Sequence, residues 1–354
     1  MTAGRSGTPG SPAAGSSLVT GALGFVGLHL VTALVRDGLD VVGAGRQPDG
    51  GPPPDRAGGF RLAGPAPDLT GAVRYEGPDG AFRYVPLDLA EPAPVARLLQ
   101  DVPATALYHL AAQSSAAASF ADPRGTVTAN LGGTLNLLEA VRALPADARP
   151  VLLAVGSGEE YGPQPDAGRL LDEDTPLNPL SPYAVSKAAQ TLLCLQYARS
   201  WDLPVIPVRA FSHTGPGQDA RFVFPTFARQ IAAAEAGRGP AEIRTGDLSA
   251  VRDFLDVRDV VAAYRLLTAR GRPGQVVNVC SGRGLTIAAG LEILVRGARR
   301  PVAVVRDPAR DRPADTPRLV GDNARLRRVT GWAPAHDIHA TLSGLLEEAR
   351  RELA

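Results

Sequence analysis

Tyr183 and Lys187 are a pair of residues that could carry out a reaction together. They stand four positions apart, and Pro182 suits the first turn of a helix, so both side chains are expected on one helix face. A phenol has a pKa of about 10, and a neighbouring ammonium lowers it by stabilising the phenolate. The pair is therefore predicted to exchange a proton with a carbonyl group that gains hydride. An ordinary amphipathic helix with an exposed lysine has the same spacing, so the surrounding sequence must decide between the two interpretations.

A glycine-rich turn near the start of the chain predicts a dinucleotide site. The apolar run of residues 17–20 is followed by three glycines spaced three apart, and then by the helical apolar spacing of residues 28–35. A strand, a glycine turn and a helix in this order let a pyrophosphate lie against the helix N-terminus. The cofactor contacts expected here are Gly21, Gly24, Phe25, Val26 and Gly27.

The end of the next predicted strand, residues 40–46, should discriminate the adenosine ribose. It carries Arg46 instead of an acid, and a guanidinium attracts the 2′-phosphate of NADP. The sequence therefore favours NADP(H) over NAD(H), with a merely solvated Arg46 as the alternative. Residues 47–80 are rich in Gly and Pro with little periodicity, and we expect a mobile insertion beside the cofactor.

Later strand exits supply further candidates. A third strand is expected over residues 82–89 and a fourth from residue 107, while the continuous apolar run 151–155 is typical of a strand covered on both faces. Asp88 could accept a hydrogen bond from the adenine amino group, or cap the next helix. Small residues after the fourth strand allow close approach of the backbone to a cofactor. The cofactor candidates at these exits are Asp88, Leu89, Leu110, Ala111 and Ala112.

Strands alternating with helical segments over the first 200 residues predict an α/β fold: a Rossmann-type doubly wound parallel sheet whose ligands bind beyond the strand C-termini. A smaller, discontinuous α/β cap is expected to bind substrate. The expected division is a disordered tail over 1–16, a cofactor domain over 17–210 and 255–280, and a cap over 211–254 and 281–354.

Composition excludes several classes of function. The 354 residues are 44% hydrophobic, and 37 basic residues balance 36 acidic ones, so no global field recruits nucleic acid or an anionic membrane. The two cysteines, Cys194 and Cys280, have no metal-ligand spacing, which favours a reducing compartment without a metal site. No apolar run is long enough to cross a membrane. We expect a cytoplasmic protein.

Taken together, the glycine turn, Ser157, Tyr183 and Lys187 resemble an extended short-chain dehydrogenase/reductase of the kind that modifies nucleotide sugars. The resemblance covers nearly all of residues 18–346. Within that superfamily, several segments are similar to the GDP-4-keto-6-deoxy-D-mannose reductases, which form GDP-D-rhamnose. These segments are residues 111–114, 158–162, 213–218, 252–258, 277–282 and 312–313.

The resemblance implies that a nicotinamide passes hydride to the C4 ketone of a nucleotide-linked 4-keto-6-deoxyhexose. Tyr183 would give the ketone oxygen its proton, and Ser157 would hydrogen-bond the same oxygen. Lys187 would hold the nicotinamide ribose and lower the phenol pKa. The competing interpretations are a buried serine, a packing tyrosine and a surface lysine.

Glu159 leaves a second activity open. In the similar sugar-nucleotide 4,6-dehydratases, a glutamate at this place abstracts the C5 proton, which a simple reductase does not require. Gly158 stands where dTDP-type dehydratases carry an acid, which argues against that type but not against GDP-mannose dehydratases. The loop 213–217 differs from theirs and favours the reductase. The alternatives are a dehydratase or epimerase that recycles its cofactor, and a non-catalytic NADP-sensing protein.

The resemblance places recognition of the nucleotide sugar mainly in the cap. Arg252 and Arg312 are candidates for the diphosphate, because guanidinium pairs with phosphate oxygens, although either could be a surface ion-pair partner. Ser212 stands where the family is expected to have Asn, which leaves the exact sugar and base open. The expected substrate contacts are Ser114, Ser157, Gly158, Glu159, Ser212, Arg252 and Arg312. The helices starting near Pro123 and Tyr183 could pair across a two-fold axis, as in similar enzymes, so a homodimer is expected.

Overall fold

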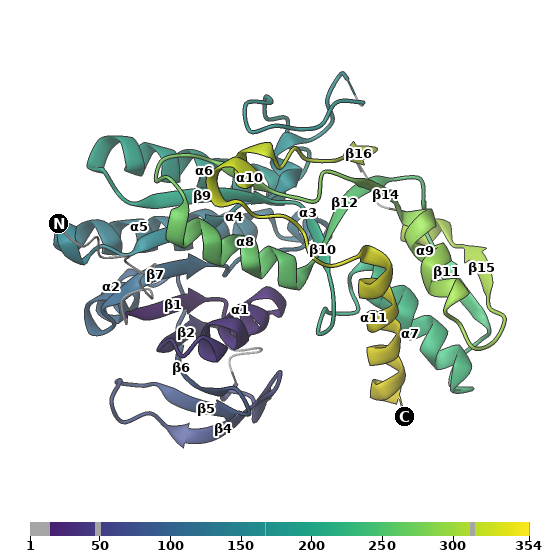
Figure 1. The fold of residues 1–354 in the computed structure, drawn as a ribbon, viewed down its shortest axis with the longest axis horizontal. Helices are drawn as coiled ribbons and strands as arrows, with labels where there is room; N and C mark the ends of the chain where they lie inside the picture. Colours follow the sequence, from purple (N-terminus) through teal and green to yellow (C-terminus); the bar gives the residue numbers. More distant parts are fainter. Residues whose placement is uncertain (1–14, 47–50, 167, 312–315, 354) are drawn as a thin grey trace, which may run out of the picture.

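The structure is a computed structural model that describes residues 15–46, 51–166, 168–311 and 316–353. Figure 1 shows two lobes: a large sheet with helices on both faces, and a smaller lobe that contains α7, α9, α11, β11 and β15. Among the described residues, no helix is long and apolar enough to span a membrane.

The large sheet has the strand order β13-β9-β8-β7-β1-β2-β6-β5-β4-β3. Seven of these strands run parallel, and β1 lies between β2 on one side and β7 on the other, so the order reverses at β1. Such a reversal opens a crevice at the carboxyl ends of the strands. The parallel strands are β1 (Ser16–Thr20), β2 (Val41–Gly45), β6 (Gly80–Pro86), β7 (Ala104–His109), β8 (Val151–Val155), β9 (Val205–Ala210) and β13 (Val277–Val279).

Helices cover both faces of this sheet, which confirms the doubly wound fold. One face packs on α1 (Phe25–Arg36), α8 (Val257–Arg270) and α10 (Ala324–Thr330). The other packs on α2 (Pro92–Asp101), α5 (Gly133–Ala143) and α6 (Pro182–Trp201). Because both faces are covered, β2 and β9 are buried along their whole length, as their apolar sequences require.

Residues 51–80 differ from the mobile, irregular insertion expected from the sequence. They form β3 (Arg56–Ala57), β4 (Phe60–Pro65) and β5 (Val73–Gly77), which extend the sheet in antiparallel fashion from β6. The rings of Phe60 and Tyr75 lie 5.0 Å and 5.1 Å from that of Phe82. This aromatic cluster gives the meander a core of its own. Residues 47–50 lie outside the described part of the chain.

The cap contains two small sheets. One is made of β10 (Ser212–Thr214), β12 (Val251–Asp256), β14 (Gly284–Thr286) and β16 (Arg318–Leu319), and the other of β11 (Glu242–Thr245) and β15 (Ala303–Arg306). The helices α7 (Val223–Glu235), α9 (Ile287–Arg296) and α11 (Ile338–Leu353) bury a core that includes Phe224, Leu291 and Leu346. The chain enters and leaves this lobe more than once.

Two stretches differ in detail from the expected division. Ser16, assigned to the tail, already pairs with Ala104 in β1, while residues 1–14 lie outside the described part. Helix α10, assigned to the cap, packs against α8 and β13 with Leu326 and Trp332 in the core of the large lobe. The domain boundaries therefore stay a prediction.

Candidate active site

The glycine turn after β1 lies directly against the exit of β7. Gly21 has a left-handed backbone (φ +72°), and a Cβ atom there would lie 2.8 Å from the Ala111 nitrogen. Gly24 precedes the first residue of α1 and donates its N–H to the Gly21 carbonyl at 3.0 Å. Apart from the two chain neighbours of Gly24, that carbonyl is the only described group within 4 Å of a Cβ built on Gly24. The open helix N-terminus at the switch point fits the pyrophosphate of a dinucleotide.

A cavity of about 260 Å³ lies between Arg46, after β2, and the segment that follows β7. The exposed Arg46 lines one side, and Gln113 with the helices that follow it lines the other. Its remaining lining residues are Ala118, Asp122, Gly125, Thr126 and Ala129. Arg46 thus faces the crevice in which a dinucleotide would lie.

Asp88 and Leu89 follow β6 at the same edge of the sheet. The Asp88 carboxylate is exposed and accepts the Ala90 N–H at 2.9 Å, while α2 begins after Glu91. The Leu89 carbonyl accepts the Asn136 side-chain amide at 2.7 Å. Asp88 is thus engaged in a local turn rather than in capping α2, and its proposed adenine contact stays a prediction.

Ser157 follows β8 and begins the short 3₁₀ turn Gly158–Tyr161. The Glu159 N–H donates to the Ser157 hydroxyl oxygen at 3.1 Å, so one acceptor position of the hydroxyl is occupied. The buried Ser157 hydroxyl also lies close enough to the Tyr183 phenol to act on its pKa. The structure therefore brings two sequence-predicted catalytic residues together.

Tyr183 lies in the first turn of α6, where Pro182 is tolerated and the Ser181 hydroxyl accepts the Ala184 N–H at 3.0 Å. The phenol is buried, and this burial raises the pKa of Tyr183 above its usual value. The charge of Glu159 acts in the same direction, and the Ser157 side chain opposes both. The expectation that Lys187 lowers the phenol pKa was therefore wrong, because burial and Glu159 raise that pKa and Lys187 does not offset them. The phenol is held protonated, which is the form that can act as an acid.

Lys187 lies one helical turn after Tyr183 and is buried. Its ammonium donates to the Val155 carbonyl at 2.7 Å and to Gln190 Oε1 at 2.9 Å. Burial lowers its pKa to about 8, and the charge of Glu160 opposes this shift. Lys187 therefore remains mostly protonated at neutral pH and is held at the end of β8.

Lys187 is also the only lysine in the sequence: the other 36 of the 37 basic residues are arginines (37 − 1 = 36). Arginine meets the need for a surface charge, whereas lysine is the base whose pKa shifts readily on burial. This composition is a sequence signal for a special role of Lys187 that the motif analysis overlooked.

Asn130 links the β7 exit to the catalytic helix and was also missed. The helix from Pro123 to Ala143 consists of α4 (Pro123–Val127), a π segment (Thr128–Gly132) and α5. Within the π segment, Asn130 accepts the Gln113 N–H at 2.7 Å and donates to the Ser186 hydroxyl at 2.9 Å. Ser186 in turn donates to the Tyr183 carbonyl at 2.7 Å. A π segment often marks a functional position in a helix.

A buried polar network beneath Ser157 was missed as well. Glu160 and Arg209 form an ion pair at 2.9 Å with side chains 0% and 6% exposed. Arg209 also donates to the Tyr161 hydroxyl at 2.9 Å, and Tyr161 donates to Asn278 Oδ1 at 2.7 Å. The available sequence signal was Arg209 within an apolar strand, since a buried charge requires a partner.

The predicted substrate contacts lie on separate elements of the two lobes. Ser212 in β10 pairs with Phe254 of β12, and Arg252 on β12 donates to the Val251 carbonyl at 2.8 Å. Ser114 is exposed after β7, whereas a Cβ atom on Gly158 would lie 3.0 Å from the Phe211 ring. Arg312 lies outside the described residues.

The loop 213–218 joins the two lobes beside the glycine turn. The His213 ring stacks on Phe25, the first residue of α1, with a centroid distance of 6.1 Å. The Pro216 carbonyl is hydrogen-bonded to His29 at 2.8 Å, and the Gly217 N–H donates to the Glu348 carboxylate at 2.9 Å. The loop that favours the reductases in the sequence therefore contacts both α1 and α11.

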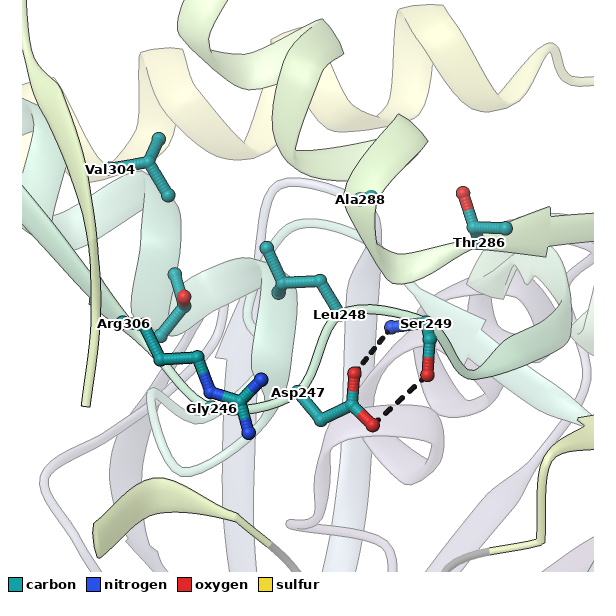
Figure 2. A pocket seen from close by; sticks show the side chains of 9 residues that line it. Gly246, Asp247, Leu248, Ser249, Thr286, Ala288, Val304 and Arg306 are labelled. Atoms are coloured by element: carbon teal, nitrogen blue, oxygen red, sulfur yellow. Dashed lines mark hydrogen bonds between the residues drawn. The ribbon is translucent and has the colours of Figure 1, made fainter. Parts of the chain in front are cut away.

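A second cavity, of about 400 Å³, is lined entirely by residues of the cap. Figure 2 shows Asp247 turned toward Ser249, whose N–H and hydroxyl donate to its carboxylate at 2.9 Å and 3.0 Å. Arg306 from β15 lies on another side of the cavity. None of the residues predicted from the sequence lines this cavity.

The doubly wound sheet, the glycine turn and the Ser157–Tyr183–Lys187 geometry define an extended short-chain dehydrogenase/reductase, an NAD(P)-dependent enzyme class. The chain belongs to the GDP-mannose 4,6-dehydratase family, whose sequence model matches residues 18–344. The resemblance inferred from the sequence is thus confirmed.

The chain is 40% identical over 261 residues to a GDP-6-deoxy-D-mannose reductase from Pseudomonas aeruginosa, covering 74% of this chain and 85% of the relative. It is 33% identical over 326 residues to a UDP-glucose 4-epimerase from Mycolicibacterium smegmatis, covering 90% and 93%. Among solved structures, RMD from Pseudomonas aeruginosa complexed with NADPH is similar with a TM-score of 0.75 and 33% identity, covering 96% of this chain and 99% of that one.

Proposed function

We propose that this enzyme reduces the C4 ketone of a nucleotide-linked 4-keto-6-deoxyhexose with NADPH, converting GDP-4-keto-6-deoxy-D-mannose to GDP-D-rhamnose. The observation that carries the proposal is the convergence of the buried Ser157 hydroxyl, at the exit of β8, and the buried Tyr183 phenol, in the first turn of α6, with Lys187 one turn further along that helix. Both hydroxyl groups could then donate hydrogen bonds to one carbonyl oxygen of the substrate. The 40% identity to a GDP-6-deoxy-D-mannose reductase supports this choice of substrate.

Each residue of the site has a distinct task in this reaction. A bound reduced nicotinamide supplies the hydride. Tyr183 transfers its phenolic proton to the ketone oxygen, and Ser157 donates a hydrogen bond to that oxygen while negative charge develops on it. The Lys187 ammonium, next in line along α6, stabilises the phenolate that remains and holds the nicotinamide ribose.

Arg46 is proposed to select NADP(H) over NAD(H). Its exposed guanidinium lines the cavity between the end of β2 and the segment that follows β7. A 2′-phosphate there would form charge-assisted hydrogen bonds with it. The NADPH in the structure of the reductase relative is consistent with this preference. The remaining proposed cofactor contacts are Gly21, Gly24, Phe25, Val26, Gly27, Asp88, Leu89, Leu110, Ala111 and Ala112.

The second candidate function is a GDP-mannose 4,6-dehydratase, for which Glu159 would be the C5 base. It is favoured by the position of Glu159, whose charge reaches Tyr183. A dehydratase uses the same serine, tyrosine and lysine, however, so these residues do not separate the two functions. The reductase is supported by the loop 213–218 and by the 40% identity to a GDP-6-deoxy-D-mannose reductase.

Two incubations separate these functions. We expect NADPH absorbance to fall with GDP-4-keto-6-deoxy-D-mannose, and no 4-keto product to form from GDP-mannose without added reductant. Glu159→Gln should keep the reductase activity within about threefold, because the reaction needs no carbon base. Formation of a 4-keto sugar from GDP-mannose, lost in Glu159→Gln, would instead establish the dehydratase. Parallel assays with the dTDP-linked 4-keto-6-deoxy sugar test which nucleotide the enzyme accepts on its substrate.

The sugar and diphosphate are proposed to lie between the crevice and the cap. Ser157 and Glu159, in the turn after β8, would lie at the reacting end of the sugar, and Arg252 on β12 would bind the diphosphate. Arg312 is proposed for the same task from the sequence. Ser114, Gly158 and Ser212 are the remaining proposed substrate contacts.

A homodimer is proposed from an apolar stripe on adjacent helices. Val127 and Leu135 of α4 and α5 are each 40% exposed, and Val185 and Leu192 of α6 are 49% and 59% exposed. Residues seven or eight apart lie on one face of a helix, so each pair forms a continuous apolar strip suited to a second copy. Both cysteines are free, and the proposed location is the reducing cytoplasm.

A further inference from the structure

The carboxylate of Glu160 is the most completely buried charge near the site, and the reaction does not use it directly. Its side chain is 0% exposed. One oxygen, Oε1, accepts the Ser157 N–H at 2.8 Å and the Thr191 hydroxyl at 3.1 Å, while Oε2 accepts from Arg209 at 2.9 Å. These three partners come from the β8 exit, from α6 and from β9.

This arrangement fixes Ser157 through its own backbone. Glu160 and Ser157 form a reciprocal capping box, in which the serine oxygen accepts a turn N–H and the glutamate accepts the serine N–H. The Ser157 oxygen accepts the Glu159 N–H at 3.1 Å, which leaves the hydroxyl proton for another acceptor, and the Tyr183 phenol lies close to it. The carboxylate therefore holds the backbone from which the serine hydroxyl projects.

The same carboxylate fixes the distance between the serine turn and the catalytic helix. Thr191 lies on α6, one turn after Lys187, so its bond to Glu160 ties that helix to the turn. The space for this bond is restricted: a Cβ atom on Gly156 would lie 2.3 Å from Glu160 Oε1. Arg209 supplies the countercharge that makes such burial tolerable.

We propose that Glu160 is a positioning residue for the reduction: it fixes the Ser157 turn against α6 and thereby aims the serine hydroxyl at Tyr183 and at the substrate carbonyl. The proposal rests on the proposed reductase function. Glu160 acts through Ser157 and Thr191 and has no contact with the reacting atoms in this role. A small displacement of a catalytic hydroxyl is costly, at roughly a hundredfold in rate for about 1 Å.

The test is a double-mutant cycle on kcat with 4-keto-6-deoxyhexose nucleotide and NADPH. Glu160→Gln is expected to lower kcat about tenfold to a hundredfold with KM nearly unchanged, because alignment rather than binding is lost. In the Ser157→Ala background, the same change should have little further effect, because the hydroxyl that Glu160 aims is absent. An equal loss in both backgrounds, or no loss in either, would overturn the proposal.

Glu160→Gln leaves Arg209 without its countercharge and could unfold the protein, so Thr191→Val is the second variant. It removes only the bond between the turn and α6, and we expect a smaller kcat loss that again vanishes with Ser157→Ala. Matched controls lie in the cap. Glu235→Gln alters the Glu235–Arg350 pair, and Thr341→Val removes a buried bond to Asp256; neither should depend on Ser157.

The outcomes distinguish the inference from the function on which it rests. A wild-type enzyme that turns over none of the GDP- or dTDP-linked 4-keto-6-deoxy sugars contradicts the proposed function. An active wild type whose Thr191→Val variant loses kcat equally with and without Ser157 contradicts only the role of Glu160.

Discussion

Lys187 donates a hydrogen bond from its ammonium to the carbonyl oxygen of Val155 at 2.7 Å, so α6 is joined to the end of the strand that leads into Ser157. Because the ammonium is buried at this place, its pKa is lowered to about 8 from 10.5. The catalytic helix therefore carries a cation whose charge changes within the working pH range of many enzymes.

The activity should depend on this charge. Lys187 is cationic below its pKa, so kcat/KM is expected to fall as the pH rises through about 8. Of the groups that face the ammonium, Glu160 and Cys194 raise its pKa, while His109 is neutral because burial lowers its pKa to about 3. Lys187→Arg should move the decline to higher pH, since guanidinium stays charged. If kcat/KM of Lys187→Arg falls at the same pH as that of the wild type, the fall is due to another group.

The single lysine allows a direct measurement of the same pKa. An amine-directed reagent can modify only Lys187 and the chain N-terminus, and mass spectrometry separates the two peptides. We expect the labelling rate of Lys187 to rise with pH around a midpoint near 8, and NADPH to slow it. Labelling that NADPH leaves unaffected would contradict the proposed contact with the nicotinamide ribose.

Tyr183→Phe should leave NADPH binding nearly intact and lower turnover by roughly a hundredfold or more, which is the contribution of a positioned acid. The measurements are NADPH fluorescence titration and kcat. Tyr108→Phe is the matched control, because it removes another buried hydroxyl, bonded to Thr268 at 2.8 Å, and should leave kcat unchanged. Wild-type turnover in Tyr183→Phe would contradict the proposed role of Tyr183 as the proton donor.

Arg46→Ala should reduce the preference for NADPH over NADH, measured as the ratio of the two kcat/KM values. Loss of a charge-assisted contact to the 2′-phosphate corresponds to a change of roughly tenfold or more in that ratio. Arg36→Ala removes an exposed arginine paired with Asp79 on the same lobe and should leave the ratio unchanged. The same ratio in Arg46→Ala and wild type would show that Arg46 does not read the 2′-phosphate.

The apolar stripe on α6 predicts the oligomeric state. Leu192→Glu places a charge on the most exposed of these side chains and should convert a dimer to a monomer in light-scattering measurements. Val304→Glu changes an apolar residue of the cap that is 49% exposed and should leave the mass unchanged. A wild-type protein that is already monomeric at micromolar concentration would exclude the proposed interface.

The sheet and its crevice could be predicted because local sequence determines them. Residues 151–155 are apolar throughout, as a strand covered on both faces requires, and the glycine turn must have a left-handed residue at Gly21. The motif order then located the serine, the tyrosine and the lysine. The meander over 51–80 was not predicted, because its glycines and prolines concealed the alternation that buries Phe60 and Tyr75.

The supporting network could not be predicted, because its members meet only through tertiary packing. Glu160 and Arg209 are far apart in the sequence, and the polarity of Glu160 resembles that of its neighbour Glu159. Only the fold shows that one carboxylate is fully buried and the other half-exposed. The phenol pKa was predicted in the wrong direction for a related reason: burial depends on the surroundings of Tyr183 and not on its spacing from Lys187.

The π segment Thr128–Gly132 adds one residue to a turn of its helix, so the residues after it are shifted by one position relative to a regular α-helix. Removing a residue there would restore uniform α-helical winding and should make the isolated helix more robust. It would also rotate one end relative to the other by about 100°, so Asn130 could not reach both Gln113 and Ser186. The π segment therefore interrupts regular α-helical winding, and it places Asn130 where its side chain connects the exit of β7 with α6.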